Sequence, residues 1–152
     1  MTNRIKLDLL HRNYAADDLN AVIEIFRSNI PKYFVPAEEP GLREFLSNHV
    51  ENYYVLECGG EVVAAGGIAL NDDDTVSLCW GMVHNDRLGT GLGKALTEYR
   101  IARSHEIFGE KPLVIVTSQH TEGFYRKYGF VTVEHTPDGF APGIDIHKMR
   151  LE

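Results

Sequence analysis

The sequence predicts one α/β or α+β domain, a sheet covered by helices. Strand-like segments alternate with amphipathic helical segments along the chain, and no internal repeat or low-complexity stretch interrupts them. The 152 residues suit a single hydrophobic core, which the 43% apolar content can fill, and a second domain would need more length. We therefore expect residues 1–152 to form one domain.

The N-terminal segment predicts a strand followed by a helix. Apolar residues alternate over residues 5–10, which indicates an opening strand. Asp17 or Asp18 can cap the helix that follows, and the helix ends at Ser28 because Pro31 cannot continue it.

A linker flanked by prolines follows this helix and carries two aromatic residues, Tyr33 and Phe34, before a second helix over residues 41–48. The two rings either form the wall of a substrate pocket or fill the core beneath the linker, and the sequence favours neither interpretation.

The middle of the chain predicts three strands joined by tight turns. Cys58-Gly59-Gly60 is a hairpin signal between the first two strands. The acidic run Asn71-Asp72-Asp73-Asp74 lacks the glycine and the bidentate glutamate of a calcium loop, so it predicts a solvated turn. The predicted strands cover residues 53–57, 61–70 and 75–84.

The last third predicts two helices and three strands. Gly109 with Pro112 ends the first helix, and Gly129 ends the second. Thr136-Pro137-Asp138-Gly139 has the composition of a turn between the last two strands. We expect helices over residues 91–107 and 121–128, and strands over residues 113–117, 130–135 and 144–151.

Composition narrows the classes of function. A formal net charge of −7 disfavours a nucleic-acid surface, because phosphate binding needs clustered Lys and Arg. We expect no membrane partner, because no apolar stretch reaches the length of a membrane span, and the polar start lacks the apolar region of a signal peptide, which predicts a cytoplasmic protein. Cys58 and Cys79 offer no metal-binding spacing and no disulfide framework, and we expect no metal.

The run Arg87-Leu88-Gly89-Thr90-Gly91-Leu92-Gly93-Lys94 lies between a predicted strand and a predicted helix, and it predicts a pyrophosphate-binding loop. Its glycines allow a tight turn, and the free N–H groups and positive end of the next helix attract phosphate oxygens. A Walker A loop is excluded because Ala95 stands where that loop needs Ser or Thr. A dinucleotide fingerprint is disfavoured because the third glycine comes at the wrong interval.

The second half of the chain resembles the GNAT acetyltransferases in two motifs and in their order. Gly91-x-Gly93 fits the coenzyme A loop of that family, and Phe124-Tyr125-Arg126-Lys127-Tyr128-Gly129-Phe130 fits its aromatic-x-x-x-Gly-Phe helix ending. The resemblance implies a mixed, mostly antiparallel sheet of six or seven strands flanked by about four helices. It also implies acetyl-CoA as cosubstrate and an amine acceptor, small molecule or peptide.

The resemblance assigns roles to individual residues. Backbone groups of Met82 and Val83 would contact the pantetheine and the acetyl carbonyl, where an N–H group stabilises the developing charge. The family has Gln or Arg at the position of Leu88, so this chain departs there, and Arg87 is a neighbouring substitute. The expected coenzyme A contacts are Met82, Val83, Arg87, Leu88, Gly89, Thr90, Gly91, Leu92, Gly93 and Lys94.

Tyr125 matches the tyrosine that protonates the leaving thiolate in many members of the family, although it could also simply pack the core. Three residues are candidates for the general base that deprotonates the amine: His120, which we favour, His84 and Glu122. A Ser118–His120 hydrolase is remote, because no Gly-x-Ser-x-Gly elbow surrounds Ser118.

The sequence therefore predicts an N-acetyltransferase that works by direct attack in a ternary complex, as a monomer or homodimer. The alternative is a degenerate acyl-CoA-binding or sensor domain that has lost turnover. Tyr33, Phe34 and Trp80 indicate a partly aromatic acceptor pocket, but the acceptor itself cannot be read from the sequence.

Overall fold

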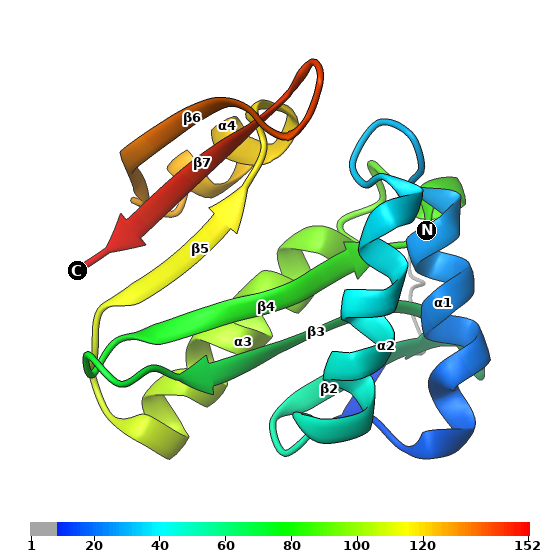
Figure 1. Cartoon of the computed structure of the whole chain (residues 1–152). Helices are drawn as coiled ribbons and strands as arrows, with labels where there is room; N and C mark the ends of the chain where they lie inside the picture. Colours follow the sequence, from blue (N-terminus) through cyan, green and yellow to red (C-terminus); the bar gives the residue numbers. More distant parts are fainter. Residues whose placement is uncertain (1–8) are drawn as a thin grey trace.

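The computed structural model describes residues 9–152, in which a seven-stranded sheet carries helices on both faces (Figure 1). The strand order is β1-β2-β3-β4-β5-β7-β6, and only the β4–β5 pair is parallel. The predicted mixed, mostly antiparallel sheet with four α-helices is confirmed. The strands are β1 (Leu9–Asn13), β2 (Tyr53–Cys58), β3 (Glu61–Leu70), β4 (Val76–Val83), β5 (Leu113–Thr117), β6 (Val131–Ala141) and β7 (Ile144–Leu151); the helices are α1 (Leu19–Ser28), α2 (Glu39–Asn48), α3 (Leu92–Phe108) and α4 (Gln119–Arg126).

Most predicted boundaries agree with the structure to within two residues. The predicted opening strand lies partly outside the described residues, and β1 is seen from Leu9 onward. The hairpin at Gly59 and Gly60 is confirmed, since both glycines adopt positive φ. Neither Asp17 nor Asp18 caps α1 through its side chain; the Asp18 carboxylate instead accepts hydrogen bonds from Arg12 and from the Ala15 N–H.

The prediction of a turn over residues 136–139 is wrong. Strand β6 continues to Ala141 with an irregular register, and the chain reverses only at the following residues, before β7 begins at Ile144. Asp138 adopts a left-handed φ of 56° within the strand. Its N–H donates to the Asp145 carboxylate on β7, so turn-forming chemistry here bends a long hairpin without ending it.

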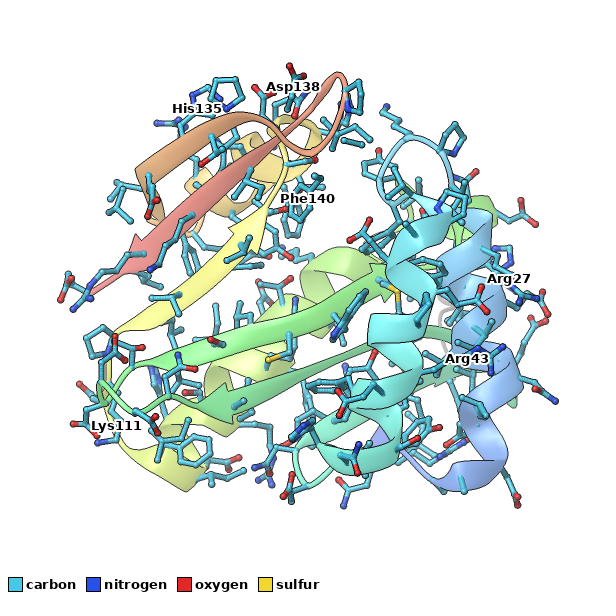
Figure 2. The ribbon with its side chains drawn as sticks, in the orientation of Figure 1. Arg27, Arg43, Lys111, His135, Asp138 and Phe140 are labelled. Carbon is cyan, nitrogen blue, oxygen red and sulfur yellow. The ribbon has the colours of Figure 1, made fainter. Side chains whose placement is uncertain are left out.

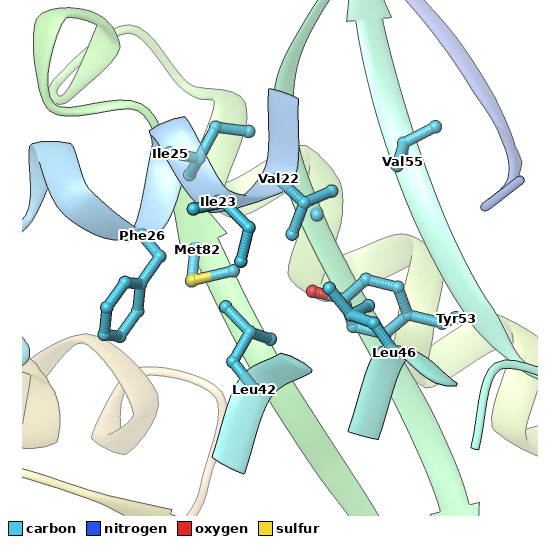
Figure 3. Close-up of a cluster of buried hydrophobic side chains, with 10 residues drawn as sticks. Val22, Ile23, Ile25, Phe26, Leu42, Leu46, Tyr53, Val55 and Met82 are labelled. Carbon is cyan, nitrogen blue, oxygen red and sulfur yellow. The ribbon is translucent and has the colours of Figure 1, made fainter. Parts of the chain in front are cut away.

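Two hydrophobic layers fix the helices to opposite faces of the sheet. Along β2, Tyr53 and Val55 belong to the cluster under α1 and α2, which Figure 3 shows, whereas Tyr54 and Leu56 belong to clusters under α3. This alternation follows the two-residue period of a strand and leaves β2 buried on both faces. No helix of residues 9–152 has the length and apolar character needed to cross a membrane.

The parallel strands β4 and β5 separate soon after they meet (Figure 1). They pair only at Val76–Leu113 and Ser77–Val114, and β5 then pairs with β7 along its length. On β4 a register shift against β3 and a left-handed φ of 45° at Trp80 accompany the divergence. The second half of β4 therefore has no strand on one side, and this open edge faces the gap between the two halves of the sheet.

Candidate active site

Val83 presents its backbone toward the open edge of β4. The N–H of His84 donates to the Val63 carbonyl on β3 over 2.8 Å. Because consecutive residues of a strand direct their backbone groups to opposite sides, Val83 faces away from β3. The Asn29 side chain donates to the Val83 carbonyl over 2.9 Å, which agrees with that direction. The Val83 N–H is therefore available at the open edge, whereas Met82 pairs with Ala65 and buries its side chain under α1 and α2.

The predicted glycine loop lies at the outer end of this edge. Gly89 and Gly91 adopt φ of 80° and 89°, which a side chain would strain, and nothing lies within 4 Å of a Cβ placed on either. Gly91 precedes α3, and a Cβ on Gly93 would lie 3.8 Å from Val83. Within the described chain, the backbone N–H groups of residues 89–94 make no hydrogen bond. The loop thus offers a row of free donors at a helix N-terminus, the geometry that binds phosphate.

The side chains of the loop contribute little charge to it. Arg87 is paired with Glu61 over 2.8 Å in a largely exposed ion pair, and Leu88 is 44% exposed. Lys94 is exposed, and Leu92 packs into the core. Exposed ion pairs are weak, so Arg87 can be drawn away by a stronger anion.

Tyr125 lies behind the point where β4 and β5 separate. It is 8% exposed and belongs to the buried cluster that also contains Leu78 of β4 and Ile115 of β5. Its ring packs edge-on against Phe124 and Phe130. Its hydroxyl oxygen lies 3.4 Å from a guanidinium nitrogen, Nη2, of Arg100, a residue that the sequence analysis did not single out.

Arg100 is a buried cation at the back of the gap. It is 1% exposed, and its guanidinium covers Gly81 so closely that a Cβ there would lie 2.7 Å from both terminal nitrogens. A sequence signal existed: Leu92, Leu96, Arg100 and Ser104 recur every four residues along α3, so two polar residues occupy a stripe that should be apolar.

Cys79, the thiol nearest to Arg100, is held in its protonated form. Burial raises its pKa to about 11, and the nearby positive charge of Arg100 opposes this only in part. A thiol with that pKa is almost entirely neutral at pH 7 and is a poor nucleophile.

His120 lies at the opening of the gap, in the first turn of α4. Its exposed ring meets Tyr33 edge-on with ring centroids 6.1 Å apart, so the linker after α1 and the start of α4 come together there. Ser118 accepts the His120 N–H with its hydroxyl, which is helix capping and accounts for the Ser-x-His spacing.

The other two candidate bases are held by local contacts. His84 accepts the Asp86 N–H at Nδ1 over 3.1 Å, while its other ring nitrogen lies 3.5 Å from Glu24. Glu122 forms an ion pair with Arg126 one helical turn later.

The three aromatic residues expected at the acceptor pocket do not stay together. Phe34 stacks on Trp80 with ring centroids 6.0 Å apart, and both pack against the core under α1 and α2. Tyr33 instead turns toward His120. Of the predicted site residues, the structure thus gathers Val83, the glycine loop and Tyr125 around the gap, with Tyr33 and His120 at its opening.

Among residues 9–152, one group of side chains has atoms that could serve as metal ligands. His135, Asp145 and His147 place such atoms within 4.8 Å of one another on the β6–β7 hairpin, where Figure 2 labels His135 and Asp138. The two rings stack at 19°, so their in-plane lone pairs do not converge, and Asp145 hydrogen-bonds to His135 over 2.9 Å. The stack and this bond explain the cluster without a cation.

A family model decides what this arrangement belongs to. The model of an acetyltransferase (GNAT) domain matches residues 26–152, which include the glycine loop, the open edge of β4 and Tyr125. The chain belongs to the GNAT acetyltransferase family. A comparison of this acetyltransferase with curated protein sequences found no match.

Solved structures share the fold of this acetyltransferase. The ribosomal-protein-S18-alanine N-acetyltransferase of Escherichia coli is 22% identical with a TM-score of 0.78, covering 94% of this chain and 92% of its own. Ard1 from Thermoplasma volcanium is 18% identical with a TM-score of 0.78, and the match covers 94% of this chain and 96% of Ard1. A structure from Salmonella typhimurium, solved with acetyl-CoA, is 19% identical with a TM-score of 0.73, and the match covers 95% of this chain and 94% of the other.

Proposed function

We propose that this acetyltransferase moves the acetyl group of acetyl-CoA to a primary amine by direct attack in a ternary complex. One observation carries the proposal: the gap between β4 and β5 has free N–H donors at its outer end and Tyr125 at its back. The Salmonella typhimurium neighbour, solved with acetyl-CoA, supports the choice of ligand.

In this proposal the cofactor lies along the open edge of β4. The pyrophosphate binds the N–H groups of residues 89–94 and the positive end of α3, and Arg87 and Lys94 add charge at the rim. The pantetheine then runs beside Met82 and Val83 toward Tyr125. The cofactor itself thereby fills the gap that the missing strand pairing leaves.

The transfer needs a group that stabilises negative charge on the carbonyl oxygen, an acid that protonates the thiolate and a base that accepts the amine proton. The amine nitrogen attacks the thioester carbon, and the Val83 N–H stabilises the negative charge that develops on the carbonyl oxygen. The C–S bond then breaks with its electron pair on sulfur, and Tyr125 donates its proton to the thiolate. His120 takes the proton that the amine loses, directly or through water, so the products are an amide and coenzyme A.

Direct transfer is favoured over an acyl-enzyme because the nearby thiol is unsuited to attack. The pKa of Cys79 is raised to about 11 by burial, and acylation of cysteine needs the thiolate. A ternary complex requires only that the acceptor reach the gap while acetyl-CoA occupies it.

The acceptor pocket is proposed at the opening near Tyr33 and His120, while Phe34 and Trp80 support the linker from the core under α1 and α2. The Escherichia coli neighbour is named for acetylation of an alanine of ribosomal protein S18, so peptide N-termini belong in any acceptor screen beside small amines.

The test has two steps. The purified protein is titrated with acetyl-CoA and coenzyme A by calorimetry, and then mixed amines and peptides are screened for thiol release. Binding with turnover supports the transferase. Binding without turnover for every acceptor class favours the sensor alternative, and no binding of either ligand contradicts the assignment of the loop.

A further inference from the structure

Arg100 is a positive charge in the core that has no counter-ion among the described residues. Its Nε and Nη1 atoms have no hydrogen-bond partner among residues 9–152, and no ion pair found there includes it. An unpaired buried charge is costly to keep. A leucine would satisfy the apolar stripe of α3 at this position, so the arginine needs a reason other than stability.

Two strands leave room for the guanidinium. A Cβ on Gly81 would lie 2.7 Å from its nitrogens, and a Cβ on Gly66 would lie 3.3 Å from its side-chain carbons. Gly81 is on β4, beside the gap, and Gly66 is its neighbour on β3. Side chains at these positions would displace the cation, so the sheet holds it in one place.

The contact with Tyr125 has a defined direction. A guanidinium can only donate, so the Tyr125 oxygen accepts from Arg100 Nη2 over 3.4 Å. The hydroxyl proton of Tyr125 must then point elsewhere, and in the described part of the chain it has no acceptor. The groups beside Arg100 include the Cys79 thiol and the Tyr53 phenol, whose pKa values burial raises, and the Tyr125 hydroxyl; no ion pair of residues 9–152 brings a carboxylate to the guanidinium.

We propose that Arg100 is a positioning residue that orients the Tyr125 hydroxyl toward the sulfur of coenzyme A and stabilises the phenolate that forms when its proton leaves. The inference rests on the proposed function. When the C–S bond breaks, the electron pair goes to sulfur, the Tyr125 proton follows it, and the phenolate forms beside the guanidinium. His120 then passes the proton that it took from the amine to the phenolate, through water, so both residues return to their starting states at each turnover.

The experiment measures Arg100→Met, Arg100→Lys, Tyr125→Phe and the double variant Arg100→Met with Tyr125→Phe. Single-turnover rates, acetyl-CoA affinity and thermal midpoints are recorded for each. Arg103→Met is the matched control, because Arg103 is on the same helix but pairs with Glu106 near the surface.

Arg100→Met is expected to slow the single-turnover step about tenfold to a hundredfold. Its acetyl-CoA affinity should stay within about twofold of the wild type. Its thermal midpoint should be equal or higher, because an unpaired charge has been removed. Arg100→Lys should recover part of the rate, and Arg100→Met should have no further effect once Tyr125 is Phe.

Three results would overturn the inference: an unchanged rate in Arg100→Met, a further loss in the Tyr125→Phe background equal to that in wild type, or a rate loss explained by a lower thermal midpoint in both Arg100 variants. A wild type that binds acetyl-CoA and turns over while Arg100→Met does so equally well contradicts only the role of Arg100. A wild type that binds no acyl-CoA contradicts the proposed function first, and the inference with it.

Discussion

Tyr33 and His120 meet edge to face across the opening of the gap, with ring centroids 6.1 Å apart. One belongs to the linker after α1 and the other to the first turn of α4, so a contact between distant segments lies at the opening of the gap.

Replacement of His120 by Asn should lower the single-turnover rate about tenfold to a hundredfold, because the amine then loses its proton only to water. Acetyl-CoA affinity should not change, since the proposed role of His120 concerns the proton of the acceptor amine and not the cofactor. Stopped-flow assays of thiol release measure the rate. His105→Asn, an exposed histidine near the end of α3, is the control, and equal rates in the two variants would remove His120 from the mechanism.

Replacement of Tyr125 by Phe removes only the hydroxyl that Arg100 contacts. The single-turnover rate should fall about a hundredfold while acetyl-CoA affinity stays unchanged, because the thiolate loses its proton donor. Tyr128→Phe, two residues after the end of α4 and partly buried, is the control. If both substitutions leave the rate intact, the two tyrosines only pack the core.

Substitution of Gly91 by Ala should weaken acetyl-CoA binding at least tenfold, because the left-handed conformation that aims the loop N–H groups would be strained. Gly109→Ala is the matched control. It places a side chain at a φ of 81° at the other end of α3, where nothing lies within 4 Å.

Both variants should lose about 1–3 kcal/mol of stability from backbone strain, measured by denaturant unfolding. Only the Gly91 variant should lose affinity in calorimetry. An equal loss of affinity in both would show that the effect arises from general destabilisation and not from the loop.

Cys79 should resist alkylation at neutral pH. Burial raises its pKa to about 11, so the reactive thiolate forms only as the pH approaches that value. In a Cys58→Ala background, the alkylation rate followed by mass spectrometry should rise through pH 9 to 11. Cys79→Ala should keep its turnover, and a covalent acetyl adduct on Cys79 in the native protein would contradict direct transfer.

The pair of Arg12 and Asp18 should make the fold sensitive to acid. The hydrogen bond from Arg12 holds the pKa of Asp18 below its ordinary value of 3.8. A carboxyl group whose pKa is lowered by folding contributes stability that is complete above 3.8 and is lost as the pH falls through the lower folded-state pKa.

Asp18→Asn should therefore lower the thermal midpoint by a few degrees at pH 7. The decrease should be much smaller at a pH below the folded-state pKa of Asp18. Asp17→Asn is the control, since Asp17 is an exposed neighbour. A loss of equal size at both pH values would show that the pair is not the source of the acid sensitivity.

The elements that local chemistry defines were predictable. Gly59 and Gly60 mark a hairpin whatever surrounds them, and the glycines at 89 and 91 need positive φ in the loop itself. Residues 136–139 were misjudged because their turn composition is overruled by a contact between Asp138 and Asp145 on another strand.

The same limit applies to the site. The place of Arg100 depends on glycines in β3 and β4, and the meeting of Tyr33 with His120 depends on the packing of two distant segments. Such long-range contacts leave no local pattern, although a polar residue in an apolar helical stripe is a signal worth following.

Only two residue pairs join β4 to β5, so the sheet is open beyond them. A bound cofactor would take the place of a strand, and any molecule that binds only the folded chain adds to the free energy of unfolding in proportion to the logarithm of its concentration. The melting temperature of this protein should therefore rise with the acyl-CoA concentration, so a thermal-shift assay would measure occupancy of the gap between β4 and β5.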